Sequence, residues 1–505
     1  MAENTTSQEF SDRLKKLEDI RKQGVNPYPE RYERTHKAVD ALKLGKKGLR
    51  AMDEVIAQNK NDIKLCGRLV AFRSHGKISF GNLQDVSGQI QICIAQNVIG
   101  DENYDFFSKK IDIADFIGVS GELFLTRTNQ ITLMVKEFIL LGKTLRPLPE
   151  KWHGLQDTEI KYRYRYLDTV MDRSAMDRFL MRTKLISLIR EYMNDREFVE
   201  VETPVLSAKA SGAIAKPFKT HHNAFDKDFF LRIAPETYLK RLIVGGFERV
   251  YEFARCFRNE GIDPSHHQEF TMLEYYAAYF NYEDNMKFTE NLFEHFIKKL
   301  FGTLKLNIYG TDIDFTPPWP RKTMRELIIE HAGIDIEEFH SAEKLRKAIT
   351  DKKIKIDGDI KTLGYGNMVD ALYKKTARQK LIQPIFVTSH PIELSPLARQ
   401  NDAKPHTTDR FQLVVNTWEV VNAYSELVDP VDQRARLTEQ ASLKSKGDVE
   451  AMEMDEDYLL AMEHGMPPIS GWGMGIDRIF ALLTSQENLK DVILFPLMRP
   501  EETNE

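Results

Sequence analysis

Two stretches of the chain alternate between apolar and polar residues, from Arg249 to Phe257 and from Glu269 to Tyr279, with a loop rich in polar residues, Gly and Pro at 259–268 between them. A period of two residues is typical of β-strands, so the pattern predicts an antiparallel pair. Four residues of the second strand share one face: Phe270, Met272, Glu274 and Tyr276. Rings, an acid and a phenol together are unusual in a core, so this face is predicted to meet a ligand.

Five shorter alternating segments precede this pair, separated by Gly, Asp, Asn and Ser, and they lie at 62–74, 77–84, 88–95, 117–125 and 130–140. Five such strands predict a small Greek-key barrel of the OB type. Before them, a helical segment rich in basic residues carries one apolar stripe, formed by Phe10, Leu14, Leu17 and Ile20. This helix could contact a nucleic acid backbone, or it could pack against the barrel with a solvated outer face.

These patterns predict a helical extension at 1–60, a barrel domain at 61–145, a linker at 146–170 and a large domain at 171–505. The length suits two domains with extensions, and the last part alone is long enough for one large core. Helical patterns without signature chemistry predict an insertion at 301–380.

The polar ends of the strand pair carry residues that could bind a nucleotide. Arg258 can fork onto phosphate oxygens, Glu260 can orient base or ribose groups, and Phe270 can stack under a purine. A solvated hairpin with a structural ion pair is the alternative. The run GWGMGIDRIFALL at 471–483 reads as a strand that opens a helix, with Arg478 in its first turn. A helix N-terminus with a guanidinium suits phosphates, although a close-packed strand and helix would need the same glycines.

Three motifs occur in the order found in class II aminoacyl-tRNA synthetases. EFVEVETPVL at 197–206 resembles the end of motif 1, FRNEG at 257–261 with the following H-x-x-E-F resembles motif 2, and the glycine run resembles motif 3. The lysyl-tRNA synthetase group is similar over most of the chain, in RIAPETYLKRLIVGGFERV (232–250), SGAIAKPFKTHHN (211–223), VVNAYSEL (420–427) and DVILFPLMRP (491–500).

The resemblance implies an α+β protein in which an N-terminal OB-type β-barrel precedes a class II catalytic domain with a mixed, mostly antiparallel sheet flanked by helices. It also implies activation of L-lysine with ATP and Mg²⁺, transfer of the lysine to tRNA(Lys), and a homodimer formed through motif 1. The lysine carboxylate would attack the α-phosphorus without a protein nucleophile, while Arg258 and Arg478 supply the catalytic charge.

A substrate with two amines and one carboxylate needs acids for the amines and an arginine or amide for the carboxylate. By resemblance Glu236 would bind the α-amino group, Arg258 and Asn422 the carboxylate, and Glu426 with Tyr276 the ε-ammonium. The expected lysine-binding set is Gly212, Glu236, Arg258, Glu274, Tyr276, Asn422, Tyr424 and Glu426. The expected ATP-binding set is Arg258, Glu260, His266, Phe270, Glu419 and Arg478; His266 could instead be a solvated loop residue.

Glu419 is the principal candidate ligand for Mg²⁺, with Glu426 and Gln412 as further candidates. The family usually has a glutamate where this chain has Gln412, which puts the number of metal ions in doubt. Glu419 also has the wrong strand parity to face the same way as Asn422, so both can serve one site only if a bulge or bend lies between them.

Arg73, Phe80 and Gln91 match the positions that read the anticodon in the resembled family. Stacking and hydrogen bonding of this kind suit single-stranded RNA, but an isolated aromatic residue in a barrel strand could also be a core residue. Gln130 stands where the family often has a glutamate.

Composition changes this picture little, because a net charge of −5 does not exclude local RNA-binding patches. Three scattered cysteines favour a reducing, cytoplasmic compartment, and no apolar run is long enough for a membrane helix. Alternatives are an aspartate- or asparagine-type synthetase, a synthetase-like protein without aminoacylation activity, and an enzyme that lysylates a protein.

Overall fold

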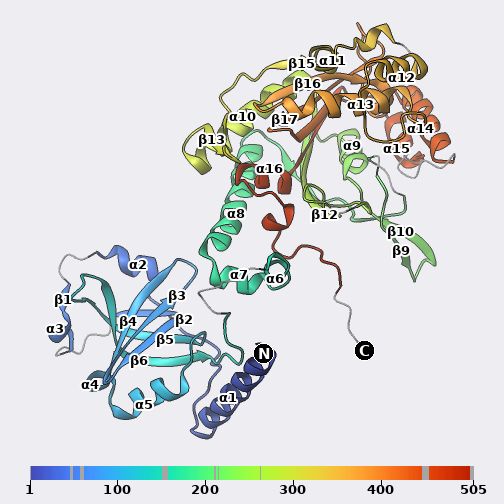
Figure 1. Cartoon of the computed structure of the whole chain (residues 1–505). Coiled ribbons are helices and arrows are strands. Elements are labelled where there is room, and N and C mark those ends of the chain that lie inside the picture. The colour runs from blue at the N-terminus through green and yellow to red at the C-terminus, as the bar shows by residue number, and fades with distance from the viewer. Residues whose placement is uncertain are drawn as a thin grey trace. The chain divides into compact units, whose positions relative to one another are not determined.

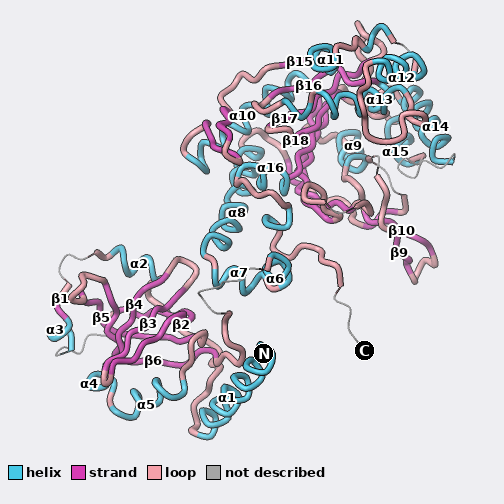
Figure 2. Tube along the Cα trace, in the orientation of Figure 1, coloured by secondary structure: helices cyan, strands magenta, loops and turns pink. Residues whose placement is uncertain are grey.

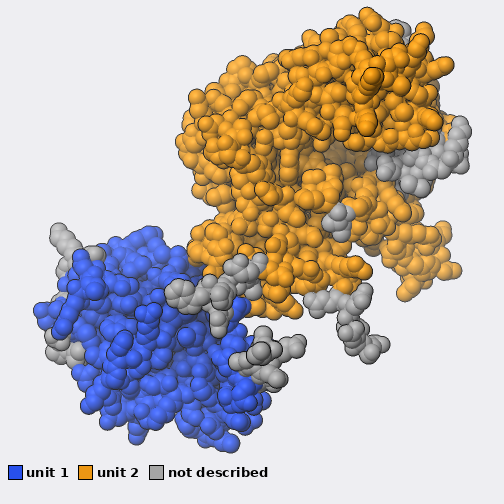
Figure 3. All heavy atoms as spheres, viewed as in Figure 1, with its two compact units in different colours: residues 1–155 blue, residues 156–505 orange. Residues whose placement is uncertain are grey.

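The computed structural model describes residues 2–45, 49–56, 62–149, 157–209, 212–213, 215–261, 263–339, 341–445 and 454–500. The chain forms two compact units, residues 1–155 and 156–505 (Figure 3). Parts of the predicted extension (46–48 and 57–60) and of the predicted linker (150–156) lie outside the described residues.

The first unit is built on a closed ring of five strands. They are β2 (Ile63–His75), β3 (Ile78–Gln84), β4 (Gln89–Ala95), β5 (Phe116–Leu125) and β6 (Ile131–Gly142). The order is β5-β2-β3-β4-β6, and β6 pairs back onto β5, so the sheet closes on itself (Figure 2). Only β4 and β6 run parallel within this ring. This order and closure confirm the predicted OB-type barrel.

Short helices surround the ring in the first unit. They are α2 (Ala38–Lys43), α3 (Met52–Ile56), α4 (Gln96–Ile99) and α5 (Asp101–Lys110), and a short strand β1 (Arg50–Ala51) pairs with β5 (Figure 1). Alternate strand residues such as Leu65, Ile92 and Val119 point inward and form the core. The alternation along each strand therefore separates the barrel interior from its outer surface.

Helix α1 (Ala2–Lys22) packs on the barrel through part of its predicted stripe. Leu17 and Ile20 of this stripe are buried, whereas Leu14 is 38% exposed. Arg13 is buried instead, because its guanidinium donates to the Ile113 carbonyl at 3.1 Å. The helix thus packs through a mixed apolar and ionic face.

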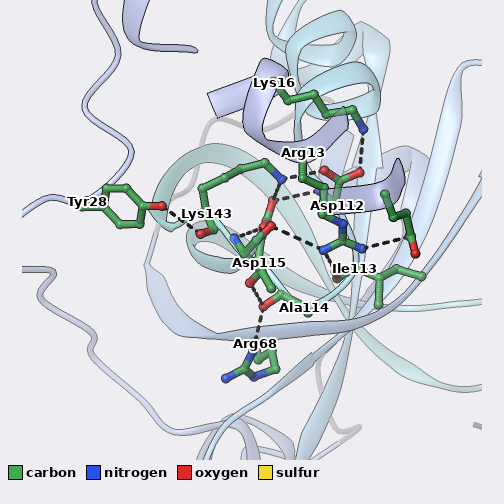
Figure 4. Close-up of polar contacts among 11 residues, drawn as sticks. Arg13, Lys16, Tyr28, Arg68, Asp112, Ile113, Ala114, Asp115 and Lys143 are labelled. Atoms are coloured by element: carbon green, nitrogen blue, oxygen red, sulfur yellow. Dashed lines mark hydrogen bonds and ion pairs between the residues drawn. The ribbon is translucent and has the colours of Figure 1, made fainter. Parts of the chain in front are cut away.

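An ionic network joins α1 to the end of β6 (Figure 4). The Lys143 ammonium is buried and lies 2.6 Å from Asp112 and 2.8 Å from Asp115, while Lys16 of α1 pairs with Asp112 at 2.6 Å. Asp115 also accepts hydrogen bonds from the backbone amides of Asp112 and Thr144. Two cations therefore balance two carboxylates, and each carboxylate of the network is satisfied.

An eight-stranded sheet organises the second unit, in the order β15-β16-β17-β18-β19-β12-β11-β7. Its strands are β7 (Val199–Glu200), β11 (Arg249–Phe257), β12 (Glu269–Ala278), β15 (Arg321–Thr323), β16 (Ile385–Pro391), β17 (Thr407–Val415), β18 (Trp418–Ser425) and β19 (Ile469–Gly475). Only the two outermost pairs, β15 with β16 and β7 with β11, are parallel. The structure confirms the predicted mixed, mostly antiparallel sheet.

The two faces of this sheet have different partners. Helices α8 (Arg173–Asn194), α10 (Tyr282–Phe301) and α16 (Ile476–Leu483) pack on one face and form the main core with it, including Tyr275 and Trp472, whose rings stack at 5.0 Å. On the other face, α9 (Glu236–Val244) packs against Tyr276 and Val250. That second face also bears the mixed residues of β12.

Further elements border the sheet. They are the hairpin strands β8 (Leu206–Ser207), β9 (Lys219–His222), β10 (Lys227–Leu231), β13 (Lys305–Ile308) and β14 (Thr311–Asp314), and helices α6 (Thr158–Arg163), α7 (Arg165–Met171), α11 (Met324–Ala332), α12 (Ala342–Asp351), α13 (Tyr365–Thr376), α14 (Pro430–Ser445) and α15 (Glu456–Glu463). Helices α11 to α13 form a separate core against β16 and β17. Among the described residues, no helix has the length and apolar character needed to cross a membrane.

Candidate active site

A cavity of about 380 Å³ opens over β12, β18 and β19 and the loop that joins β11 to β12. Nearly all residues predicted to bind ATP or lysine line it, with Glu426 as the exception. The lining includes Gly212, Glu236, Arg258, Glu260, His266, Phe270, Glu274, Tyr276, Glu419, Asn422, Tyr424 and Arg478. One strand parity accounts for Phe270, Glu274 and Tyr276, because alternate residues of β12 point into the cavity.

Glu274 lies at the centre of the sheet, where its strand register sets it opposite Glu252 and Gly473. It is buried, and the Tyr276 hydroxyl donates to its Oε1 at 2.8 Å. Burial, with the nearby Glu236 carboxylate, raises the pKa of Glu274 to about 8. Glu274 is therefore a buried acid that lacks a cationic partner of its own within salt-bridge distance among the described residues.

Glu236 begins α9 and shares a buried cation with Glu426. The Lys240 ammonium, one helical turn after Glu236, lies 2.6 Å from Glu236 Oε1 and 2.5 Å from Glu426 Oε2. The Tyr424 hydroxyl also donates to Glu236 Oε1, at 2.8 Å. Burial acts to lower the pKa of Lys240, but Glu236 and Glu426 outweigh it and raise that pKa well above its usual value. The two carboxylates therefore favour the ammonium form of Lys240, while burial raises the pKa of Glu426 well above its usual value.

Two glycines leave room for the acidic side chains to pack against the backbone: Gly471 beside Glu426 and Gly212 beside Glu236. A Cβ atom on Gly471 would lie 2.2 Å from Glu426 Oε1 and 2.5 Å from the Tyr276 ring. Gly212 has a φ of +91°, and a Cβ atom there would lie 3.3 Å from the Glu236 Cβ. A side chain at Gly471 would displace the Glu426 carboxylate, and one at Gly212 would strain the backbone.

Two arginines, Arg258 and Arg410, line the same cavity as Glu236 and Glu274. The Arg258 guanidinium lies 5.1 Å from the centre of the Phe270 ring, and its Nε makes no hydrogen bond among the described residues. Arg410 of β17 lines the cavity, donates from Nε to Asn422 Oδ1 at 2.8 Å, and is held by the Leu394 carbonyl and the Ser395 hydroxyl. The amide nitrogen of Asn422 thus stays available while its oxygen is engaged.

Arg478 follows Gly475 in the first turn of α16, where helix dipole and guanidinium combine. Its Nη1 donates to the backbone carbonyl of Glu419 at 3.0 Å, and burial lowers its pKa. His266 is exposed in the loop, and its Nδ1 lies 2.9 Å from Asp263. Its predicted contact with pyrophosphate remains a prediction.

The three proposed metal ligands do not form one cluster. A bulge displaces the register between Leu413 and Val414, so Glu419 pairs with Val414 and faces the same way as Gln412 and Asn422. The bend that Glu419 needs is therefore present. Gln412 is buried and does not line the cavity, and the Glu426 carboxylate is held by Lys240. Glu426 and Gln412 as metal ligands therefore remain predictions, and Lys240 already pairs with Glu426 Oε2.

No group of three or more His, Cys, Asp or Glu side chains that could hold a metal occurs in the described part of the chain. Glu419 remains as a single carboxylate beside the cavity. One carboxylate suits Mg²⁺ that arrives on ATP, because this ion takes most of its ligands from phosphates and water. The donor set therefore fits a phosphate-bound Mg²⁺ ion and does not form a protein cage.

A second set of predicted residues lies on the outer surface of the barrel. The register pairs Arg73 with Phe80 and Asn82 with Gln91, so Arg73, Phe80 and Gln91 share one face. Arg73 is exposed; Phe80 is half-buried and packs against a small apolar cluster with Cys93 and Phe124. Gln91 Oε1 accepts from the Thr132 hydroxyl at 2.7 Å, which orients its amide. Phe80 is not in the barrel interior.

Sequence reasoning missed two residues of the cavity region, Lys240 and Arg410. Lys240 follows Glu236 by four residues on one helix, a spacing that brings side chains together. Arg410 has the parity of Gln412 on the strand next to Asn422. The helical spacing of Lys240 and the strand parity of Arg410 could both have been found in the sequence. They were overlooked because the search considered only acids for the amines and an arginine or amide for the carboxylate of the substrate.

Comparison with known proteins agrees with this geometry. Residues 157–499 match the family described as tRNA synthetases class II (D, K and N), and residues 63–141 match the OB-fold nucleic acid binding domain. The chain is 46% identical over 490 residues to a lysine–tRNA ligase of Pelotomaculum thermopropionicum, covering 97% of this chain and 94% of that protein. It is 44% identical to lysine–tRNA ligases of Thermosipho africanus, over 97% of this chain and 95% of that protein, and of Carboxydothermus hydrogenoformans, over 97% and 98%.

Proposed function

Because this chain belongs to the class II tRNA synthetases of the aspartate, lysine and asparagine group, we propose that it is a lysine–tRNA ligase. It activates L-lysine with ATP to give lysyl-adenylate and pyrophosphate, and it transfers the lysine to the 3′ end of tRNA(Lys). The observation that carries this choice of amino acid is a group of three buried acids: Glu236 and Glu274 line the cavity, and Glu426 shares the Lys240 ammonium with Glu236. An aspartate enzyme would need a free cation there, whereas the Lys240 ammonium is already paired with Glu236 and Glu426.

In this proposal each charged group of lysine binds a different part of the site. The α-ammonium meets Glu236, the ε-ammonium meets Glu274 with the Tyr276 hydroxyl beside it, and the carboxylate meets Arg258 and the Asn422 amide. A buried carboxylate rejects an amino acid that lacks the matching ammonium, because the acid would stay unpaired. Glu274 joins Glu426 and Tyr276 in this assignment because it lines the cavity.

In the first step, a lysine carboxylate oxygen attacks the α-phosphorus of ATP, and the bond from that phosphorus to the bridging oxygen of pyrophosphate breaks. Arg258 and Arg478 both line the cavity and stabilise the developing negative charge. Phe270 supports the base, and Glu260 orients base or ribose groups. Mg²⁺, held by Glu419 and the phosphates, would neutralise the charge of the outer phosphates.

In the second step, a terminal ribose hydroxyl of the tRNA attacks the activated carbonyl, and AMP leaves.

The barrel face formed by Arg73, Phe80 and Gln91 binds the anticodon. Phe80 stacks on a base, Arg73 contacts a phosphate, and Gln91 forms hydrogen bonds with a base edge. The reaction belongs to the cytoplasm, which suits the three free cysteines.

The protein acts as a homodimer through motif 1. Apolar side chains are exposed along α8, β7 and the segment that follows: Leu180 at 45%, Val199 at 46%, Val205 at 40% and Leu206 at 46%. Exposed apolar side chains in this part of the chain are consistent with a protein interface there. Sedimentation should give twice the mass of the chain, and a monomer would contradict this part of the proposal.

The decisive experiment is ATP–pyrophosphate exchange with each of the twenty amino acids at saturating Mg²⁺. Exchange with lysine alone is the expected result. Exchange with aspartate or asparagine would show that lysine is not the substrate, although the protein would still be a class II synthetase. No exchange with any amino acid would indicate a synthetase-like protein without aminoacylation activity. Charging of tRNA(Lys) transcripts with altered anticodons then tests the barrel face.

A further inference from the structure

One buried carboxylate ties the first turn of α16 to β12. Strand β19 ends at Gly475, opposite Met272, so Thr271 lies beyond the last pair of the β12–β19 ladder. The Thr271 amide donates instead to Asp477 Oδ2 at 2.7 Å. Asp477 is 2% exposed, so water screens this contact little. Asp477 therefore fixes the start of α16 on β12 where the hydrogen bonds between the strands stop.

A third element holds the other oxygen of the same carboxylate. The Nη2 atom of Arg182, on α8, lies 2.5 Å from Asp477 Oδ1. The Arg182 side chain is 20% exposed, and no second cation lies within salt-bridge distance of Asp477 in the described part of the chain. A buried carboxylate needs a cation to stay charged, so Arg182 keeps Asp477 able to accept from the Thr271 amide.

Both ends of this connection lie next to residues assigned to ATP. Phe270 precedes Thr271 on β12, and Arg478 follows Asp477 on α16. All four of these residues line the cavity. The hydrogen bond joins positions that are 206 residues apart in the sequence. The Asp477 carboxylate therefore sets how far the ring that supports the base lies from the guanidinium that meets the phosphates.

The contacts of Asp477 suit a positioning role better than direct binding of ATP or Mg²⁺. Each of its oxygens already accepts a hydrogen bond, one from an amide and one from a guanidinium. Arg478 Nη1 donates to the Glu419 carbonyl of β18 at 3.0 Å. The start of α16 is thus held on β12 through Asp477 and on β18 through Arg478.

We propose that Arg182 and Asp477 are positioning residues for ATP, and that their ion pair holds Phe270 and Arg478 at the separation that the nucleotide requires. This inference rests on the proposed lysine–tRNA ligase function. Neither residue of the pair touches a reacting atom. Glu236, assigned to the lysine α-ammonium, is held by Lys240 and Tyr424 and has no contact with the pair. Loss of the pair should therefore weaken ATP binding and leave lysine binding unchanged.

The test measures ATP and lysine separately on the full-length protein. Titration with Mg²⁺-ATP in the absence of lysine gives the ATP Kd, and ATP–pyrophosphate exchange gives the KM of each substrate. In Arg182→Gln and in Asp477→Asn, the ATP Kd and KM should rise about tenfold, because small displacements of positioned groups weaken their contacts. The lysine KM should stay within about twofold of the wild type, since the two sites share no contact with the pair.

A general disturbance of the domain predicts a different result. It would raise the lysine KM together with the ATP KM, and that outcome overturns the proposal. An ATP Kd that stays at the wild-type value in both single variants overturns it as well. Because the two residues act as one unit, the variant that combines both changes should be no more impaired than the worse single variant. Additive losses would show that the residues act separately and would also reject the pair.

Arg182→Lys separates the charge from the shape of the side chain. Only Nη2 of Arg182 reaches Asp477, and the Arg182 Nε makes no hydrogen bond among the described residues. One ammonium can supply this single contact, so the ATP Kd should return to within about threefold of the wild type. Equal impairment of the Lys and Gln variants would contradict the role given to the charge.

Arg190→Gln is the matched control on the same helix. Arg190 pairs with Glu200 at 2.9 Å on an exposed surface and does not line the cavity, so its ATP Kd should equal that of the wild type. If Arg182→Gln does not fold, the double variant decides, because it leaves no unpaired charge; a folded double variant with the wild-type ATP Kd overturns the proposal. A wild-type protein that binds ATP without lysine-dependent exchange would instead reject the proposed function, and the ATP Kd would still test the pair.

Discussion

Each of the two units contains a lysine whose ammonium is fully buried between two carboxylates, yet the surroundings differ. In the barrel unit, Lys143 with Lys16 balances Asp112 and Asp115. In the catalytic unit, Lys240 alone faces Glu236 and Glu426, with Glu274 beside them and a cavity in front. The first cluster is closed and its charges are paired, whereas in the second two acids share one ammonium and Glu274 has no cation within salt-bridge distance among the described residues.

The difference in charge pairing distinguishes a buried ion cluster that stabilises the fold from one that binds a ligand. A balanced cluster with backbone hydrogen bonds needs nothing further, and it ties α1 to the barrel. An unbalanced cluster beside a cavity has lost the solvation of its carboxylates without full compensation. A cationic ligand supplies that compensation, so burial with a charge deficit is a signature of a binding site.

The largest effect on stability is expected from Lys143→Met in the balanced cluster. Removing one partner of a buried ion pair leaves Asp115 uncompensated and should lower the free energy of unfolding of the barrel unit by about 3 to 5 kcal/mol. Urea unfolding measures this change. The lysine KM in pyrophosphate exchange should not move, and a loss below about 1 kcal/mol would contradict the role given to this cluster.

Glu274→Gln should affect binding and leave stability nearly intact. It removes the carboxylate assigned to the ε-ammonium at a cost of about 1 to 3 kcal/mol, which corresponds to about a 5- to 150-fold rise in the lysine KM. Glu269→Gln on the same strand is the matched control, because Glu269 does not line the cavity. Equal lysine KM values in the two variants would reject the assignment.

The pH dependence of lysine binding sharpens the same contrast. With a pKa of about 8, Glu274 holds a proton below that pH in the free site, where Glu236, Glu252, Lys240 and the Tyr276 hydroxyl surround it. The substrate ammonium must displace this proton, so the lysine KM should fall as pH rises from about 6.5 to about 8, by at most about tenfold per unit. Glu274→Gln should remove this slope, and a lysine KM that rises with pH over this range would contradict the prediction.

The smallest effect is expected from Lys16→Met at the edge of the balanced cluster. The Lys16 side chain is 33% exposed, so water and salt screen its pair with Asp112. The free energy of unfolding should fall by about 0 to 1 kcal/mol, and less at high salt. A loss as large as that of Lys143→Met would show that exposure does not separate the two lysines.

Much of the architecture was predictable, because strand alternation is a local property. The expected strands 249–257 and 269–279 correspond to β11 (Arg249–Phe257) and β12 (Glu269–Ala278), and the barrel strands agree within two residues. Periodicity did not show that Arg13 is buried through a carbonyl partner far along the chain while Leu14 stays exposed. Lys240 was missed as a pocket residue for a similar reason.

The site shows where sequence reasoning reached its limit. Parity on β12 and β18 correctly brought Glu274, Tyr276 and Asn422 to one cavity. The orientation of Glu419 depended on a bulge that parity cannot reveal, and the structure contains that bulge. Which acid faces the ligand and which is already held depended on the packing of α9 against the sheet.

The sequence by itself determined the order of the elements, with the barrel before the synthetase fold. It also determined the residue types available for ATP and lysine, because periodicity and motifs are local properties of the sequence. Only the tertiary structure decided how these charges are shared. Lys240 of α9 meets Glu426, which follows β18, across a long sequence separation. Electrostatic balance depends on distance and burial in three dimensions, and neither can be read from residues in a line.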